Sequence, residues 1–362
     1  MIKTSTKKIC IVVSSLGIGG AERSSALLSE ILFDLGFQVH IVSVLHYVDY
    51  PYKGELLNLG ELKLQDDSRL GRLKRLRVFH NYIKQHDFDY VIDNRTRIGF
   101  FKELVISKWV YSNQNVIYYV HSYNTDNYIN PNRLLGKYLY GSVTRIVSVS
   151  KAIADKLKHK YGFNRITTIY NPIPDLTTQQ IIDDTSYEPY ILYFGRLDDK
   201  VKNISLLIDA YDISVLKKNN VKLKILGDGE DKDMLQEKVK TMNLSQFVEF
   251  LPFNPGPYNI VKNAYFTVLT SRYEGFPMVI PESLALGTPV VSVDCKSGPN
   301  EVIIHEENGL LVENDNIEAL TKAMNRMLED KDLYLQCKSN AKKSVEKFSK
   351  DDIKQQWKTL LK

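Results

Sequence analysis

Two successive series of apolar runs and helical patterns, separated by one aperiodic segment, constrain the fold of this 362-residue chain most strongly. The first series opens with the apolar run Ile9–Ser14, a glycine-rich turn, the helical pattern Ala21–Leu35 and a second apolar run, Val39–Val44. A continuous apolar run is typical of a strand buried on both faces, and a helix between two such strands predicts a parallel sheet. Further runs of this kind are Tyr90–Ile92, Val116–Val120, Ile146–Val149 and Ile166–Ile169.

The pattern stops at Asn171–Pro174, and residues 175–189 are polar, acidic and without apolar period, as is typical of a linker. A second series of the same kind begins with the apolar run Tyr190–Phe194. Its later strand-like runs are Leu223–Leu226, Phe266–Thr270 and Val290–Val293. The predicted organisation is an α/β domain at 1–171, a linker at 172–189, a second α/β domain at 190–348, and a C-terminal helix at 349–362 that packs back across the domain interface.

Composition excludes several classes of protein. Hydrophobic residues make up 43% and charged residues 25% of the chain, so disorder and low-complexity folds have no support. The cysteines, Cys10, Cys295 and Cys337, form no CxxC pair, which favours reduced thiols and a cytoplasmic location. No apolar stretch is long enough for a membrane span. Net charge is +10 over residues 1–171 and −5 over 172–362, so we expect the first half to face an anionic partner such as nucleic acid, a membrane surface or a phosphorylated substrate.

The first glycine-rich loop, Gly17–Arg23, lies between a predicted strand and a predicted helix. The backbone N–H groups of a helix N-terminus favour an anion, so the loop predicts phosphate binding, whereas a purely structural tight turn remains an alternative. It does not match a dinucleotide-binding fingerprint, because Glu22 stands where the third Gly or Ala is required. The chain also has no GxxxxGK[ST] motif, which excludes a P-loop NTPase.

Two carboxylates eight residues apart, Glu274 and Glu282, follow the predicted strand Phe266–Thr270. We expect one in the loop and one in the first turn of a helix whose first residue is Pro281, so that both point into one crevice at the strand ends. Carboxylates placed in this way can bind sugar hydroxyls or act as the acid and base of a hydrolase. A capping Glu282 beside a solvated Glu274 is the purely structural alternative.

The run from Ser271 to Val291, SRYEGFPMVIPESLALGTPVV, resembles the Glu-x7-Glu signature of retaining nucleotide-sugar glycosyltransferases of the family 4 type. The resemblance implies the GT-B fold, in which two Rossmann-like domains with parallel sheets face a central cleft. It extends over nearly the whole chain. The further motifs in the family's order are GGAER at 19–23, YFGRL at 193–197 followed by Lys202, LGDGE at 226–230, SGPNE at 297–301 and Asn308-Gly309. The sequence departs from the family pattern at Leu251–Phe253, near the expected base pocket, and at Ile280-Pro281.

The resemblance also implies roles for individual residues. Arg196 and Lys202 match the basic pair that binds the donor diphosphate, and fixed cations there stabilise the departing phosphate without a metal. Glu274 matches the residue that contacts the transferred sugar, and Glu282 the one that binds the ribose. The other implied donor-binding residues are Ser271, Gly275, Phe276 and Pro277 in the same run, and Gly19 and Gly20 from the other domain.

Two residues of the first half receive a role from the resemblance. His121 follows the apolar run Val116–Val120, where ligand groups concentrate in α/β sheets. A lone histidine is usually structural, but this position matches a catalytic histidine beside the donor sugar. Asn171 matches a position near the acceptor.

No metal or other cofactor is expected. The DxD triplet Asp87–Asp89 precedes a predicted strand, and the triplet Asp231–Asp233 begins a predicted helix, whereas a metal-diphosphate site is expected in a loop after a strand.

The resemblance implies a same-face displacement in which the leaving phosphate takes the acceptor proton.

Basic residues alternate with leucines at 69–77, which predicts a basic helix with an apolar stripe. Such a helix could dock on an anionic bilayer, or its stripe could pack on the sheet with the charges in solvent.

We therefore expect a metal-independent, retaining transferase that moves a hexose or N-acetylhexosamine from a UDP-sugar to a hydroxyl of a lipid-linked or growing surface glycan, such as a lipopolysaccharide or capsule. Its expected partners are the nucleotide-sugar donor, the lipid-linked acceptor and, through residues 69–77, the inner face of the plasma membrane, with no nucleic acid. A UDP-sugar epimerase or hydrolase of the same fold and a non-catalytic sugar-nucleotide-binding protein are the alternatives.

Overall fold

The computed structural model describes residues 6–17, 19–174 and 188–362, and the chain divides into two compact units. Unit 1 comprises Met1–Pro172 together with Lys350–Lys362, and unit 2 comprises Ile173–Ser349. Residues 175–187 of the predicted linker 172–189 lie outside the described residues.

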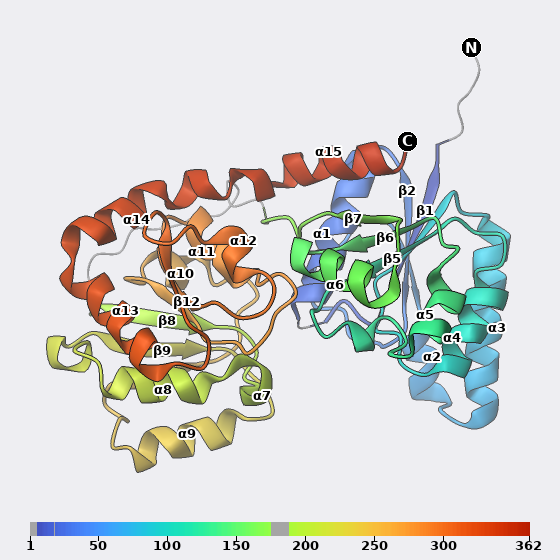
Figure 1. The fold of residues 1–362 in the computed structure, drawn as a ribbon. Helices are drawn as coiled ribbons and strands as arrows, with labels where there is room; N and C mark the ends of the chain where they lie inside the picture. The colour runs from blue at the N-terminus through green and yellow to red at the C-terminus, as the bar shows by residue number, and fades with distance from the viewer. Residues whose placement is uncertain (1–5, 18, 175–187) are drawn as a thin grey trace. The chain divides into compact units, whose positions relative to one another are not determined.

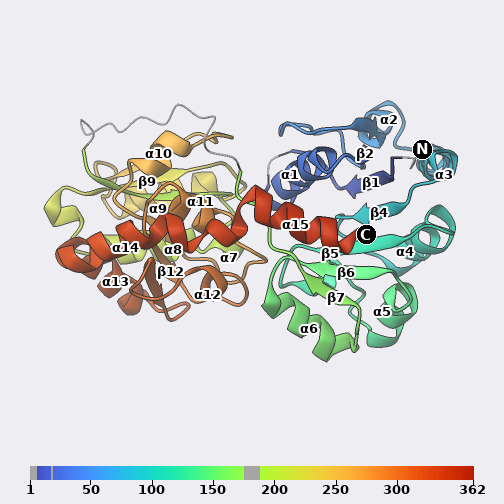
Figure 2. The same cartoon turned by 90° about the horizontal axis from the view of Figure 1, so that it is seen from above.

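Unit 1 contains a parallel sheet with the strand order β3-β2-β1-β4-β5-β6-β7. Figure 2 shows α1 and α6 on one side of this sheet and α3, α4 and α5 on the other. The strands are β1 (Lys8–Val13), β2 (Gln38–Ser43), β3 (Glu55–Asn58), β4 (Tyr90–Asp93), β5 (Val116–Val120), β6 (Arg145–Ser148) and β7 (Ile166–Thr168). The helices are α1 (Gly20–Asp34), α2 (Leu59–Gln65), α3 (Arg69–His86), α4 (Phe100–Val105) with the π-helical turn Ile106–Val110, the 3-10 turn Thr125–Asn127, α5 (Arg133–Tyr140), α6 (Lys151–Tyr161) and α15 (Lys350–Leu360).

The C-terminal helix α15 belongs to unit 1. Its Trp357 is buried and packs edge-on against Tyr119 of β5, with 5.7 Å between the ring centroids. The Lys350 ammonium lies 3.1 Å from carboxylate oxygens of both Glu30 and Asp34 on α1. The apolar spacing of this segment therefore serves to close the core of the first sheet.

Unit 2 contains a second parallel sheet, with the strand order β10-β9-β8-β11-β12-β13. Side chains alternate along β8: Ile191 and Tyr193 join a core cluster with residues of α8, α9 and α13, whereas Leu192 and Phe194 join a cluster with residues of α10 and α11. Figure 1 shows α8 and α9 on one side of this sheet and α10 and α11 on the other. The strands are β8 (Tyr190–Phe194), β9 (Lys222–Leu226), β10 (Val248–Leu251), β11 (Thr267–Leu269), β12 (Val290–Val293) and β13 (Gly309–Val312). The helices are α7 (Asp199–Lys202), α8 (Ile204–Asp212), α9 (Lys232–Thr241), α10 (Tyr258–Lys262), α11 (Val279–Ala285), α12 (Pro299–Val302), α13 (Ile317–Glu329) and α14 (Lys331–Ser344), with 3-10 turns at Lys217–Asn219 and Glu346–Phe348.

Helix α11 begins two residues before Pro281, so this proline is the third helical residue and not the first, as the sequence predicted. The proline is tolerated because the N–H groups of the first helical turn have no partner within the helix. The first backbone bond of that turn to a carbonyl four residues earlier runs from Glu282 to Met278, at 3.0 Å. Glu282 is therefore the fourth helical residue, two positions later than predicted, and it lies in the first turn as expected.

Candidate functional site

The loop after β8 carries the predicted diphosphate-binding residues of unit 2. Arg196 is exposed immediately after the strand, and the Tyr193 hydroxyl donates to its carbonyl at 2.8 Å. The chain then makes the single turn α7, whose N-cap Asp198 accepts a hydrogen bond from the backbone N–H of Val201. Lys202 ends this turn, so both cations are presented by one short, tightly bonded segment.

The Leu226–Glu230 motif packs closely against the backbone of this loop. A Cβ on Gly227 would lie 1.9 Å from the Gly195 carbonyl oxygen, and one on Gly229 would lie 2.3 Å from the Leu197 carbonyl oxygen. Only glycine permits such close backbone approaches. Asp231, from a DxD triplet, accepts a hydrogen bond from the Asp199 N–H at 2.7 Å, so it fixes the same loop.

Lys202 is joined to the segment that follows β11. The Thr270 hydroxyl donates to the Lys202 carbonyl at 2.9 Å, and the Arg272 N–H donates to the Val201 carbonyl at 2.8 Å. The Lys202 ammonium lies 2.6 Å from Glu274 Oε1, to which the Ser271 hydroxyl also donates at 2.7 Å. The structure therefore brings Lys202, Ser271 and Glu274 together at one point.

The loop Gly275–Pro277 is held by the Ser297–Glu301 motif. The Ser297 hydroxyl donates to the Gly275 carbonyl at 2.7 Å. Gly298 has a φ of 105°, and a Cβ there would lie 2.3 Å from Cδ of Pro277. Gly275, Phe276 and Pro277 are buried, as is Glu282 on α11 with 3% of its surface exposed. The two predicted carboxylates therefore differ. Glu274 is partly exposed beside a lysine, whereas Glu282 is buried at the start of a helix, where the helix dipole stabilises a negative charge.

His121 of unit 1 lies directly after β5 and is 8% exposed. Burial, assisted by the charge of Arg97, lowers the pKa of His121 to about 3, so the imidazole is neutral at physiological pH. Among the described residues, neither ring nitrogen of His121 has a hydrogen-bond partner. A buried, neutral imidazole with unsatisfied nitrogens is suited to bind a hydroxyl group of a ligand.

Arg97 fixes the backbone around His121 and was missed by sequence reasoning. Its side chain is fully buried and donates to the carbonyls of Asp93, Arg95, Tyr119 and Tyr128. Its guanidinium also lies 4.7 Å from the ring centroid of Tyr118. Arg97 thus ties the ends of β4 and β5 together, and its place in a charged Asn-Arg-Thr-Arg stretch after a strand was the only available signal.

Gly19 and Gly20 lie where the sequence placed them, at the N-terminus of α1, although their neighbour Ile18 is outside the described residues. Gly19 is the N-cap of α1, and a Cβ on Gly20 would meet no atom within 4 Å. Asn171 is buried in the same unit, where its Oδ1 accepts a 2.7 Å hydrogen bond from Ser24 of α1 and a weaker one from Tyr119.

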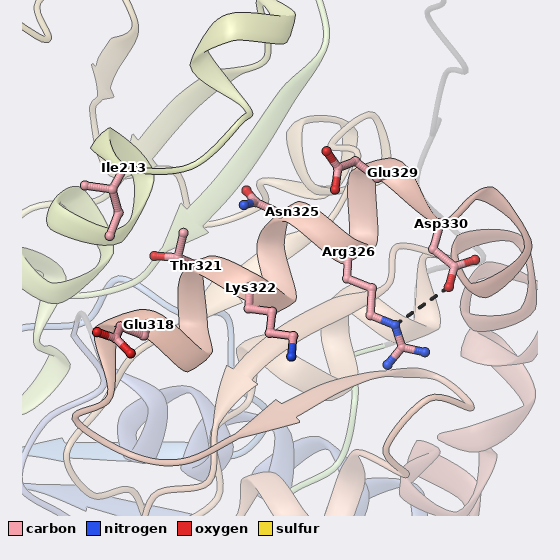
Figure 3. A pocket seen from close by; sticks show the side chains of 8 residues that line it. All are labelled: Ile213, Glu318, Thr321, Lys322, Asn325, Arg326, Glu329 and Asp330. Atoms are coloured by element: carbon pink, nitrogen blue, oxygen red, sulfur yellow. Dashed lines mark ion pairs between the residues drawn. The ribbon is translucent and has the colours of Figure 1, made fainter.

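A hollow of about 610 Å³ in unit 2 is lined mainly by α13, and none of the site residues named above lines it (Figure 3). It is lined by alternating charges, and its Arg326 forms ion pairs with Glu306 and Asp330. Because the lining mixes acidic residues (Glu318, Glu329 and Asp330) with basic ones (Lys322 and Arg326), it favours neither sign of ligand charge, and we assign no ligand to this hollow. Over residues 6–17, 19–174 and 188–362, no cluster of three or more His, Cys, Asp or Glu is placed to hold a metal ion. Within the same ranges, no helix has the length and apolar character needed to span a bilayer.

Comparison with known proteins agrees with this geometry. A family model described as Glycosyltransferase Family 4 matches residues 18–175, and one described as Glycosyl transferases group 1 matches residues 178–344. The chain is 32% identical over 366 residues to the N-acetylgalactosamine-N,N'-diacetylbacillosaminyl-diphospho-undecaprenol 4-alpha-N-acetylgalactosaminyltransferase of Campylobacter jejuni, covering 96% of this chain and 97% of that protein.

A second Campylobacter jejuni relative, GalNAc-alpha-(1->4)-GalNAc-alpha-(1->3)-diNAcBac-PP-undecaprenol alpha-1,4-N-acetyl-D-galactosaminyltransferase, is 26% identical, with 98% of each chain covered. The crystal structure of Anabaena HepE in complex with UDP-glucose has the same fold, with a TM-score of 0.78, 20% identity and coverage of 98% of this chain and 99% of that one. Two parallel-sheet domains of this kind define the GT-B class. This chain belongs to the GT-B glycosyltransferases of the family 4 type, as its motifs predicted.

Proposed function

We propose that this glycosyltransferase moves a hexose or N-acetylhexosamine from a UDP-sugar to a hydroxyl of a lipid-linked or growing surface glycan, with retention of configuration. The observation that carries the proposal is the 2.6 Å pair of Lys202 and Glu274. Lys202 would bind the leaving diphosphate, and Glu274 would bind the sugar hydroxyls. The two side chains are adjacent, as they must be for a donor in which the sugar is bonded directly to the diphosphate.

The proposed reaction breaks the bond between the anomeric carbon and the diphosphate oxygen and forms a bond to the acceptor oxygen on the same face of the sugar. The acceptor proton moves to the leaving phosphate, so the products are UDP and the glycoside. Arg196 and Lys202 stabilise the charge that develops on the diphosphate, which is the work that a metal ion does in other transferases. Catalysis then depends mainly on orientation and fixed charge.

The acceptor class and the UDP donor rest on relatives. Both Campylobacter enzymes carry a diphospho-undecaprenol or PP-undecaprenol acceptor in their names, and the HepE structure holds UDP-glucose. We transfer a lipid-linked glycan acceptor and a UDP-sugar donor to this chain as part of the proposal.

The proposal also includes peripheral attachment to an anionic membrane through α3. The apolar stripe of this helix is buried only in its second half, at Phe79 and Ile83, whereas Leu70 is 77% and Leu73 64% exposed. Lys74 and Arg77 are exposed on the same helix. Exposed leucines beside cations match the chemistry of an anionic lipid surface.

The test is a matrix of donors and acceptors with the purified full chain. UDP-, GDP- and ADP-sugars are each incubated with a lipid-diphosphate-linked glycan acceptor and without it. We expect release of UDP that depends on the acceptor, and a glycoside whose anomeric coupling matches that of the donor by NMR. Epimerised donor or free sugar without acceptor would point to an epimerase or hydrolase. Saturable binding of donor without any turnover would point to a binding protein.

A further inference from the structure

A second pocket, of about 700 Å³, lies entirely within unit 1 and is not used by the donor-site residues. Its walls come from the segment after β2, from α2 and α3, and from the β4–α4 segment with the π-helical turn. Val44 follows β2 and Arg95 follows β4, so the pocket opens at the carboxyl ends of the strands, the edge where parallel α/β sheets bind ligands. His121 follows β5 at the same edge.

One part of this pocket is apolar. Leu73, Leu76 and Phe79 line it from α3 at a spacing of three residues, and Ile106 faces them from the π-helical turn. Phe79 is buried, but Leu73 is 64% exposed. A pocket whose apolar wall continues onto exposed leucines is suited to an aliphatic chain that leaves the protein toward a lipid phase.

The other part is strongly cationic. Among its described lining residues, six are basic and one, Asp67, is acidic. Asp67 is already paired with Arg75 at 2.7 Å and lies 3.5 Å from Arg72. The six basic residues are Lys63, Arg69, Arg72, Arg75, Arg95 and Lys102.

Part of this charge is committed to the fold. Arg95 is 4% exposed and is held by Asp93 at 2.6 Å and Glu103 at 3.2 Å. Lys102 is also partly committed, since its ammonium lies 3.7 Å from a Glu103 carboxylate oxygen. Within the described part of the chain, Lys63 and Arg69 have no carboxylate partner within 4 Å, and the charge of Lys63 acts on Asp67 only from beyond that distance. The pocket therefore has a cationic excess that an anionic ligand would neutralise.

We propose that this pocket binds the phosphate-bearing end of an amphiphile, namely a diphosphate attached to an aliphatic isoprenoid chain. The cations receive the diphosphate, and the wall formed by Leu73, Leu76 and Phe79 receives the first part of the chain. This inference rests on the proposed function, because it assigns a binding site to the lipid carrier of the acceptor.

The experiment uses farnesyl diphosphate, which has both parts of this ligand, in calorimetric titrations of the full chain below the concentration at which the probe forms micelles. Inorganic diphosphate and farnesol are titrated separately. We expect saturable binding of farnesyl diphosphate, at least about tenfold weaker in the double variant Lys63→Gln/Arg72→Gln, since a charge-assisted contact to the diphosphate is lost at each of the two positions. Inorganic diphosphate and farnesol should each bind more weakly than the complete amphiphile.

The matched control is Lys84→Gln/Lys358→Gln, which removes the same charge from exposed positions of unit 1 outside the pocket. It should bind the probe like the unaltered chain, and thermal melting should show that both variants are folded. Equal binding of inorganic diphosphate would show that the apolar wall has no role and would overturn the proposal. Adsorption to anionic phospholipid vesicles without saturable binding of the monomeric probe would assign the cations to a membrane surface and would overturn it as well.

The same variants separate this inference from the proposed function. Lys63→Gln/Arg72→Gln should leave UDP binding unchanged, because both cations lie outside the donor-binding segments of unit 2. If the chain transferred sugar but did not bind farnesyl diphosphate, only the pocket assignment would be wrong. If it bound the probe through these residues but transferred nothing, only the proposed function would be wrong.

Discussion

The ammonium of Lys202 lies 2.6 Å from Glu274 Oε1, and the two residues come from the loops after β8 and β11, neighbouring strands of one sheet. Their side chains are 23% and 11% exposed, so the pair is partly shielded from water. The Ser271 hydroxyl fixes the same carboxylate oxygen. Glu274 is therefore held in place by two partners, Lys202 and Ser271.

Metal independence follows if Arg196 and Lys202 supply the charge that stabilises the leaving diphosphate. We expect the acceptor-dependent release of UDP to continue at an unchanged rate in excess EDTA. The measurement is the initial rate before and after chelation, with a transferase known to require Mn²⁺ as the control. A rate that falls on chelation and returns with Mg²⁺ or Mn²⁺ would contradict the role given to these cations.

Gly227→Ala should damage the donor site from a distance. The new Cβ would overlap the Gly195 carbonyl oxygen at 1.9 Å, and Gly227 has a φ of 152°, so the loop carrying Arg196 must move. Backbone strain of this kind costs about 1–3 kcal/mol, and we expect UDP affinity to fall about tenfold together with the melting temperature. The control is Gly256→Ala, where the nearest atom to a new Cβ is a Tyr258 ring carbon at 3.3 Å. Equal UDP affinities in the two variants would show that the glycine does not shape the site.

His121 should remain neutral in the folded protein well below the usual pKa of histidine. Burial first, and Arg97 second, lower its pKa to about 3. NMR titration of the imidazole Cε1 protons should show that the His121 signal, assigned with His121→Asn, does not titrate between about pH 7.5 and pH 5.

The same shift has a consequence for stability. As the pH falls below about 6.5, the unfolded chain takes up a proton at His121 that the folded chain does not, so stability is lost between about pH 6.5 and pH 3. At about pH 5 this loss amounts to about 2 kcal/mol, and it should be absent in His121→Asn. The unfolding free energy of the two proteins, compared at neutral pH and at about pH 5, measures it. A parallel pH dependence in both would mean that His121 titrates normally.

Attachment to membranes should depend on the exposed first half of α3. We expect Leu70→Ser/Lys74→Gln/Arg77→Gln to reduce cosedimentation with anionic vesicles at least about tenfold, because each basic residue contributes roughly 1 kcal/mol at such a surface. These three residues do not line the pocket of about 700 Å³ between α2, α3 and the β4–α4 segment, so farnesyl diphosphate binding should be retained. Added salt should weaken vesicle binding of the unaltered chain in the same way, since it screens the attraction. If the folded variant cosedimented as well as the unaltered chain, α3 would not be the site of membrane attachment.

The interior strands could be predicted from the sequence, and so could the edge strand β7, which was expected at Ile166–Ile169, but the edge strands β3, β10 and β13 could not. Strands β1, β5 and β8 are almost wholly buried, so their sequences are continuous apolar runs. The edge strand β3 is only partly buried and begins with the exposed Glu55, and β10 at the edge of the second sheet is similar. Such strands lack the apolar signal because one side of each remains close to solvent.

The candidate site shows the same division. The motifs could be found in the sequence because each contains unusual glycines, prolines or charges. The contacts between the motifs could not be predicted, because they join residues far apart in the sequence. Gly227 must be glycine because the Gly195 carbonyl, 32 residues earlier, lies against it, and the buried Arg97 donates to the carbonyl of Tyr128. An arginine in a charged stretch predicts exposure, and only the tertiary fold brings the distant carbonyls of Tyr119 and Tyr128 to its guanidinium.

The most direct test of the account is the affinity for UDP, without sugar, of two variants that break the same ion pair from opposite sides. Lys202→Ala should weaken UDP binding about 10–100-fold in calorimetric titration, as should Arg196→Ala, because a charge-assisted contact to the diphosphate is lost. Glu274→Gln should bind UDP as well as the unaltered chain does but should turn over the donor sugar much more slowly, because its carboxylate contacts only the sugar. If Glu274→Gln weakened bare UDP as much as Lys202→Ala did, the assignment of these residues to opposite ends of the donor would be wrong.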